Sequence, residues 1–196
     1  MIKAEDVFRA FQPHRGDAIV VRTGTAGQHW LDVTTKPERD LLLGGALGHS
    51  NSAAFGVALG LPKEKVVLFD SEGALLMSLG ILATIAEKRP RNFYHFLMDN
   101  RCYATTGGQP VPNALNIDFA GVAKAAGYAA VYSFEDLETF TAQVGKILSQ
   151  PGPVFVAIKI VAEVENAPIG QRKRRPARTR AETIRDLREE LRITGA

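Results

Sequence analysis

Short apolar runs alternate with longer amphipathic segments along most of the chain. Runs rich in β-branched or aromatic residues, bounded by glycine, proline or charged residues, predict buried strands at 18–21, 66–69, 92–98, 129–132 and 153–160. Between them, apolar residues recur at helical spacing. These segments predict helices at 5–11, 50–61, 73–87, 118–126, 134–148 and 180–192.

Strands that alternate with helices favour one architecture. A parallel sheet needs a crossover between successive strands, and the helices of those crossovers cover both of its faces. We therefore expect an α/β fold in which a doubly wound parallel sheet is the middle of three layers. Polar and glycine-rich residues at 23–45 predict mostly loop. We expect one domain over 1–170, followed over 171–196 by a basic connector and a C-terminal helix.

Composition and charge narrow the class of protein. The 196 residues are 45% hydrophobic and 23% charged, as in an ordinary globular domain. Much of the small positive excess lies in the run Arg172–Arg175, so we do not interpret the domain as a nucleic-acid binder. The single cysteine, Cys102, excludes an internal disulfide. With no membrane-spanning apolar stretch and no secretory signal, the sequence favours a cytoplasmic protein.

Two neighbouring strand ends carry oxygen-bearing side chains. Glu72 follows the strand at 66–69, and Asn100 follows the strand at 92–98. In an open parallel sheet, ligands bind beyond the carboxyl ends of the strands. Carboxylate and amide oxygens suit Mg²⁺, and backbone N–H groups at a helix start suit a diphosphate. On this pattern alone, a helix cap at Ser71 or Glu72 and a turn at Asp99-Asn100 are the favoured explanation of these residues.

The same residues resemble a known family. Ser71-Glu72-Gly73 and Asp99-Asn100 match, at the right spacing, the metal motif of the diphosphate-binding (PP) domain of thiamine diphosphate enzymes. The resemblance covers roughly 17–165. Two segments are particularly similar to the sulfopyruvate decarboxylase beta subunits and the phosphonopyruvate decarboxylases: GALLMSLGILATIAEKRPRN and MDNRCYATTGGQP. Glu72 replaces the usual aspartate and Ser71 a glycine, so the metal motif is altered.

The resemblance implies a thiamine diphosphate-binding fold and a set of site residues. Mg²⁺ would be held by Glu72, Asn100 and the main-chain carbonyl of Cys102, whose sulfur needs no catalytic role. The diphosphate would be contacted by Thr23, Gly24, Ser71, Glu72, Gly73, Ala74, Asn100, Cys102 and Tyr103.

A second segment, Gly44–His49, resembles the stretch that keeps the cofactor bent. The Gly45 carbonyl would accept a hydrogen bond from the aminopyrimidine, with Leu47 between the two rings and Gly48 beside it. His49 would be an acid or base near the cofactor. The alternatives are a glycine-rich turn with Leu47 in the core and a surface or cap histidine. For 23–25 and 105–109, the alternatives to cofactor or substrate contacts are a polar turn and a mobile surface loop.

The chain has room for one such domain. In this family, the glutamate that activates the cofactor comes from a pyrimidine-binding (PYR) domain. We therefore expect a separate PYR-domain subunit, a hetero-oligomer and a small 2-oxo acid as substrate. The predicted function is the diphosphate-binding subunit of a two-subunit carboxy-lyase, inactive alone. The alternatives are a non-catalytic or regulatory subunit, a carboligase of the acetolactate synthase type, and another nucleotide-binding domain. The last would want Gly-x-Gly-x-x-Gly, which 23–28 lacks.

Overall fold

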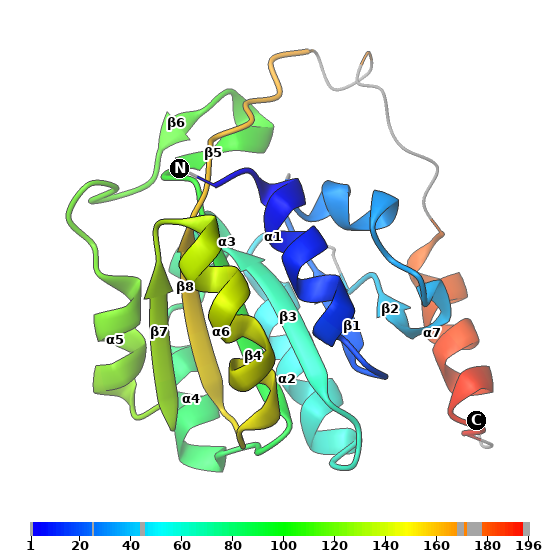
Figure 1. The fold of residues 1–196 in the computed structure, drawn as a ribbon. Coiled ribbons are helices and arrows are strands. Elements are labelled where there is room, and N and C mark those ends of the chain that lie inside the picture. Colours follow the sequence, from blue (N-terminus) through cyan, green and yellow to red (C-terminus); the bar gives the residue numbers. More distant parts are fainter. Residues whose placement is uncertain (1, 25, 44–45, 168–170, 172–177, 194–196) are drawn as a thin grey trace.

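A six-stranded parallel sheet runs through the middle of the molecule (Figure 1). The computed structural model describes residues 2–24, 26–43, 46–167, 171 and 178–193. The strand order is β2-β1-β3-β4-β8-β7, and every neighbouring pair is parallel. In chain order the strands are β1 (Ile19–Arg22), β2 (Asp40–Leu41), β3 (Val66–Ser71), β4 (Phe93–Asp99), β7 (Ala130–Phe134) and β8 (Val154–Lys159).

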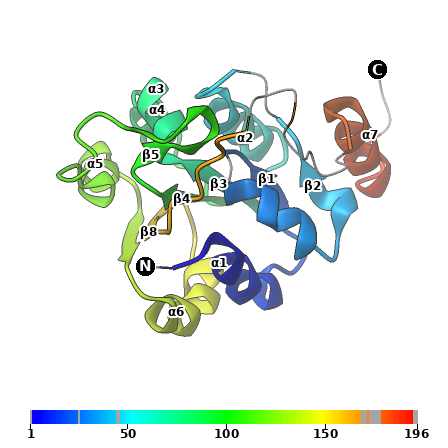
Figure 2. The same cartoon turned by 90° about the horizontal axis from the view of Figure 1, so that it is seen from above.

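Helices cover both faces of the sheet, as predicted (Figure 2). One face carries α1 (Ala4–Phe11) and α6 (Leu137–Ser149). The other carries α2 (His49–Gly60), α3 (Glu72–Met77), α4 (Ile81–Lys88) and α5 (Phe119–Ala126), while α7 (Arg180–Glu190) lies at the β2 edge. The predicted three-layer α/β fold is confirmed. None of the helices in the described ranges is long and apolar enough to cross a membrane.

Each strand feeds two hydrophobic cores because successive side chains point to opposite faces. In β3, Val67 and Phe69 face the core under α1 and α6, whereas Val66 and Leu68 face the core under α2, α4 and α5. All four side chains are fully buried, which explains why β3 is a continuous apolar run rather than an alternating one. The apolar run continues to Phe69, and the polar residues Asp70 and Ser71 end the strand.

Two stretches differ from the predicted elements. The expected helix at 73–87 is two helices, α3 and α4, because Ser78 leaves the helical conformation with φ −142° and ψ 38°. The expected loop at 23–45 contains the short edge strand β2 and two 3-10 helices, η2 (Ala26–Asp32) and η3 (Pro37–Arg39). Two further 3-10 turns are η1 (Gln12–His14) and η4 (Ala104–Thr106). Side-chain hydrogen bonds to distant parts of the chain, described below, stabilise the break at Ser78.

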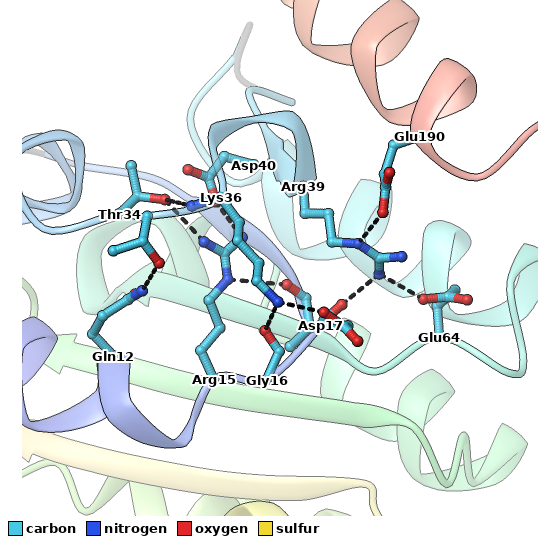
Figure 3. Close-up of polar contacts among 12 residues, drawn as sticks. Gln12, Arg15, Gly16, Asp17, Thr34, Lys36, Arg39, Asp40, Glu64 and Glu190 are labelled. Carbon is cyan, nitrogen blue, oxygen red and sulfur yellow. Dashed lines mark hydrogen bonds and ion pairs between the residues drawn. The ribbon is translucent and has the colours of Figure 1, made fainter.

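The C-terminal helix α7 packs on the domain through a polar edge (Figure 3). Arg39 donates to Glu190 of α7 at 2.9 Å and to Glu64 at 2.8 Å, and Leu187 of α7 is buried. Beside this edge, Arg15 donates to Asp40 at 2.6 Å. The predicted C-terminal helix is therefore attached to the domain on one side. The basic run Arg172–Arg175 lies outside the described residues.

Candidate functional site

The two predicted strand ends meet at the carboxyl edge of the sheet. β3 and β4 are paired with Ser71 opposite Met98, so Glu72 and Asn100 follow at neighbouring positions. Ser71 caps α3, since its hydroxyl accepts a hydrogen bond from the Ala74 N–H at 3.4 Å. The cap that the pattern alone suggested is therefore present. It does not compete with a ligand site, because the side chain of Glu72 points elsewhere.

Glu72 and Asn100 converge on one backbone N–H. The Cys102 N–H donates to Glu72 Oε1 at 3.0 Å and to Asn100 Oδ1 at 3.0 Å. The other Glu72 oxygen, Oε2, accepts from the Asn100 N–H at 3.3 Å. The two side-chain oxygens are thus within hydrogen-bond distance of a common atom. The structure brings together the residue pair that the spacing singled out.

The carboxylate of Glu72 is buried among neutral backbone donors. Its residue is 0% exposed, and burial raises its pKa from an ordinary 4.5 to about 7. Within this net shift, the charge of Asp99 also raises the pKa, and backbone N–H donors of Glu72, Asn100 and Cys102 lower it. We find no ion pair to Glu72 within the described part of the chain. The site can therefore gain a positive ion that would stabilise the charged form.

Cys102 lies in a small antiparallel ribbon beside the site. It belongs to β5 (Cys102–Tyr103), which pairs with β6 (Gln109–Pro110). Pro110 faces Cys102 and has no N–H, and the Cys102 N–H points away from β6 to Glu72. Burial and the charge of Glu72 raise the pKa of the Cys102 thiol, which favours its unreactive form.

Two glycines let neighbouring segments approach the start of α3. A Cβ added to Gly73 would lie 2.7 Å from Cε1 of Tyr103, so the tyrosine ring rests on this glycine. A Cβ added to Gly24, whose φ is +72°, would lie 3.1 Å from Cβ of Ser71. The loop after β1, with Thr23 and Gly24, therefore reaches the same place as the predicted metal motif.

The Leu47–His49 turn packs against α3 through Gly48. Gly48 has φ +87°, and a Cβ there would lie 2.7 Å from Cβ of Met77 and 3.1 Å from the Ala74 carbonyl oxygen. Leu47 is 51% exposed, so the alternative that placed it in the core is wrong. His49 is exposed at the first position of α2. Gly45, predicted to contact the aminopyrimidine, lies outside the described residues.

The loop that joins β5 to β6 contacts the segment that follows β8. The Glu165 N–H donates to the Ala104 carbonyl at 2.9 Å, and a Cβ added to Gly108 would lie 2.9 Å from Val164. Residues 104–109 are therefore packed against another part of the chain in this structure.

A metal at this edge of the sheet would not be held by charged side chains alone. Across the residues that the structure describes, no group of three or more His, Cys, Asp or Glu side chains could hold a metal ion. A metal at Glu72 would need amide and main-chain oxygens as well. Sequence reasoning missed the polar side chains behind the site, Asn51, Asp70 and Ser78. A charged residue at the end of an apolar strand was the available signal for Asp70.

Comparison with known proteins agrees with this geometry. The family model described as "Thiamine pyrophosphate enzyme, C-terminal TPP binding domain" matches residues 24–158. Subunit beta of sulfopyruvate decarboxylase from Methanothermobacter thermautotrophicus is 31% identical over 153 residues, 78% of this chain and 78% of that protein. The Methanococcus maripaludis protein of the same name is 33% identical over 164 residues, 83% of this chain and 86% of that protein.

Longer relatives match as well. Phosphonopyruvate decarboxylase of Streptomyces hygroscopicus is 35% identical over 138 residues, 69% of this chain, but the chain spans 34% of that protein. Among solved structures, benzoylformate decarboxylase from Polynucleobacter necessarius has the same fold, with TM-score 0.68 and 20% identity over 83% of this chain and 33% of that one. The family predicted from the metal motif is confirmed, and this chain belongs to the thiamine pyrophosphate enzymes through their C-terminal TPP binding domain.

Proposed function

We propose that this chain is the diphosphate-binding subunit of a two-subunit enzyme that uses thiamine diphosphate and Mg²⁺ to decarboxylate 2-oxo acids. Relatives named as sulfopyruvate decarboxylase subunit beta, which the chain matches over most of their length, support a separate subunit. Relatives named as phosphonopyruvate decarboxylase support the reaction class.

One observation carries the proposal: Glu72 Oε1 and Asn100 Oδ1 both lie 3.0 Å from the Cys102 nitrogen. Both are hard oxygen donors of the kind that Mg²⁺ prefers alongside phosphate oxygens. The raised pKa of Glu72 shows that a buried negative charge is costly there without a cation. The residues present therefore fit the metal, although glutamate stands where the family has aspartate.

A third oxygen is available from the backbone. In an extended strand, the N–H and C=O of one residue point to the same side. The Cys102 N–H points to Glu72, so its carbonyl lies on the edge that faces the site. Glu72, Asn100 and the carbonyl of Cys102 would hold Mg²⁺ in the proposed function.

Segments around α3 would hold the rest of the cofactor. Gly73 and Ala74 offer backbone N–H groups to the diphosphate, and Thr23, Gly24, Ser71 and Tyr103 surround it. Leu47, exposed on the turn that touches α3, would separate the two rings, beside Gly48 of the same turn. The carbonyl of Gly45, which lies outside the described residues, would accept a hydrogen bond from the aminopyrimidine. His49, exposed beside that turn, would move a proton at its imidazole.

The chemistry that thiamine diphosphate supplies when bound is to accept the electron pair released as carbon dioxide leaves. This chain would anchor and orient. Burial of Glu72 would keep water from its carboxylate at the metal, and Leu47 would be the apolar side chain beside the reacting region. The activating glutamate would come from a PYR-domain partner. Leu47 and Met77, 51% and 56% exposed at this edge, suit a surface that such a partner covers.

The test is calorimetry of thiamine diphosphate binding with Mg²⁺, on the chain co-expressed with a PYR-type partner. We expect Glu72→Gln to weaken binding by about 100-fold or more, near 2.7 kcal/mol. Glu87→Gln, at an exposed side chain near the end of α4, is the matched control and should bind as the wild type does. Equal affinity of Glu72→Gln and wild type would refute the metal role of Glu72. Product analysis with 2-oxo acids then separates decarboxylation from carboligation.

The hydrogen bonds that the Glu72 carboxylate accepts from the backbone favour a second candidate function, a non-catalytic subunit. Its carboxylate already accepts hydrogen bonds from the N–H groups of Asn100 and Cys102. A domain in which its own N–H groups satisfy this carboxylate would not need a metal. The same titration decides, because a non-catalytic subunit would give no Mg²⁺-dependent heat with any PYR-type partner.

A further inference from the structure

A chain of buried polar side chains lies behind the proposed site. Asp70, at the end of β3, accepts from Asn51 of α2 at 3.4 Å and pairs with His95 of β4 at 3.2 Å. These three residues are each 0% exposed. Burying a polar side chain costs free energy unless it is hydrogen-bonded, and these three are hydrogen-bonded to one another. We therefore ask what the buried chain of hydrogen bonds does.

The hydrogen-bond chain continues outward to the cofactor side. Asn51 donates to the Ser78 hydroxyl at 2.8 Å, and that hydroxyl donates to the Gly48 carbonyl at 2.9 Å. At the other end, the second oxygen of Asp70 accepts from the Ser71 N–H at 2.9 Å. The polar chain therefore joins Ser71, the cap before Glu72, to Gly48 in the Leu47–His49 turn.

Ser78 explains why one expected helix is two. Its non-helical backbone, at φ −142° and ψ 38°, separates α3 from α4. That break places the hydroxyl between Asn51 and the Gly48 carbonyl rather than along a continuous helix surface. Direct contact reinforces the link, because Gly48 packs against Met77 and the Ala74 carbonyl of α3.

These contacts connect the two halves of the proposed site. The segment Ser71–Ala74 would hold the diphosphate, and the Leu47–His49 turn would hold the rings. We infer that Asn51 and Ser78 are positioning residues, which fix the spacing between these segments so that one ligand can contact both. Asp70 anchors the link in the core, and none of the three needs to touch the cofactor. The inference rests on the proposed function.

The test compares two ligands of the same protein, assembled with its partner subunit. Dissociation constants with Mg²⁺ are measured for thiamine diphosphate, which spans both segments, and for inorganic pyrophosphate, which reaches one. We expect Ser78→Ala to raise the constant for thiamine diphosphate about tenfold, the size expected for one hydrogen bond, and to leave pyrophosphate binding within about twofold. Ser78→Thr, which keeps a hydroxyl, should recover wild-type binding.

Two further variants separate positioning from folding. Like Ser78→Ala, Asn51→Ala should raise the dissociation constant of thiamine diphosphate and leave that of pyrophosphate nearly unchanged. The double variant should bind thiamine diphosphate little more weakly than either single variant, because both changes interrupt the same chain of hydrogen bonds. Ser149→Ala removes a similar hydroxyl at the end of α6, which donates to the Lys146 carbonyl within the same helix, and should change neither constant. Thermal melts confirm that each variant is folded at the temperature of the titration.

Each outcome decides something. If Ser78→Ala leaves both constants unchanged, or raises both equally, the positioning role is wrong. If the folded variants Ser78→Ala and Asn51→Ala change the two dissociation constants differently, the two residues do not act through one chain of hydrogen bonds. If the wild-type assembly binds neither ligand, the proposed function itself fails and takes the inference with it.

Discussion

Two carboxylates are buried at opposite places in this domain, and their surroundings differ. Asp40, at the β2 edge, receives a hydrogen bond from the Arg15 guanidinium at 2.6 Å (Figure 3). Glu72, at the carboxyl edge of β3, receives hydrogen bonds from neutral backbone N–H groups. Burial raises the pKa of both carboxyls, but the charge of Arg15 opposes the shift at Asp40, whereas Asp99 adds to the shift at Glu72.

This difference indicates that the charge of Asp40 is structural, whereas the charge of Glu72 is available to a ligand. Arg15 is itself held by the Thr34 hydroxyl and the Ala18 carbonyl, and its guanidinium lies 5.2 Å from the centre of the Trp30 ring. The buried charge of Asp40 is therefore balanced by a cation of the same chain. Glu72 pairs with no cation in the described ranges, so a positive ion from outside would stabilise it. Two isosteric changes, Asp40→Asn and Glu72→Gln, therefore probe opposite properties.

The largest effect is expected at the structural edge. Asp40→Asn leaves the guanidinium of Arg15 buried without its counter-charge, which costs about 3 kcal/mol or more. For a domain of this size, that lowers the melting temperature by about 10 °C. Differential scanning calorimetry measures the shift. The folded variant should bind Mg²⁺-pyrophosphate as the wild type does; weaker binding would mean that the two regions are coupled.

A slightly smaller effect is expected from pH at Glu72. Because burial raises the pKa of Glu72 to about 7 in the folded protein, its favourable contribution is present below pH 4.5 and is lost as pH rises through 7. The free energy of unfolding of the wild type, minus that of Glu72→Gln, should fall by up to about 3 kcal/mol over this window. Urea denaturation at a series of pH values measures the difference.

Magnesium sharpens the same comparison. A metal binds the charged carboxylate, so added Mg²⁺ should stabilise the wild type more at pH 8 than at pH 6 and should not stabilise Glu72→Gln. A flat difference between the two proteins across pH would mean that the Glu72 carboxyl is not desolvated as the structure has it. Asp40→Asn keeps Glu72 and should retain the response to magnesium.

Local patterns were enough to predict most of the sheet. Runs such as Val66–Phe69 are apolar on both faces because the strand is buried on both faces, and no distant contact is needed to recognise them. The edge strand β2 was missed because Asp40 and Leu41 carry little strand signal of their own. They are extended because β1 pairs with them and α7 packs against them.

The site was predictable to the extent that it repeats a family motif. Spacing and resemblance pointed to Glu72 and Asn100, whose convergence the structure shows. The break at Ser78 was not predictable, because its partners Asn51 and Gly48 lie 27 and 30 residues away in sequence. Helical periodicity continues through 73–87, and tertiary hydrogen bonds override it. For the same reason, sequence alone could not link Asp70 to the turn that contains Leu47.

The smallest effect is expected next to Glu72, at Gly73. A methyl group there would lie 2.7 Å from the ring of Tyr103, too close without movement. The ring is partly exposed and can shift, and alanine favours the helix more than glycine does. We therefore expect Gly73→Ala to cost about 1 kcal/mol at most. In a double-mutant cycle with Tyr103→Ala, followed by urea denaturation, the cost should disappear once the ring is absent. If Gly73→Ala is equally costly without the ring, backbone conformation rather than the tyrosine requires glycine at this edge. In either case Gly73→Ala should lower the free energy of unfolding far less than Asp40→Asn does. The partly exposed ring of Tyr103 can move, whereas the buried guanidinium of Arg15 cannot regain a counter-charge.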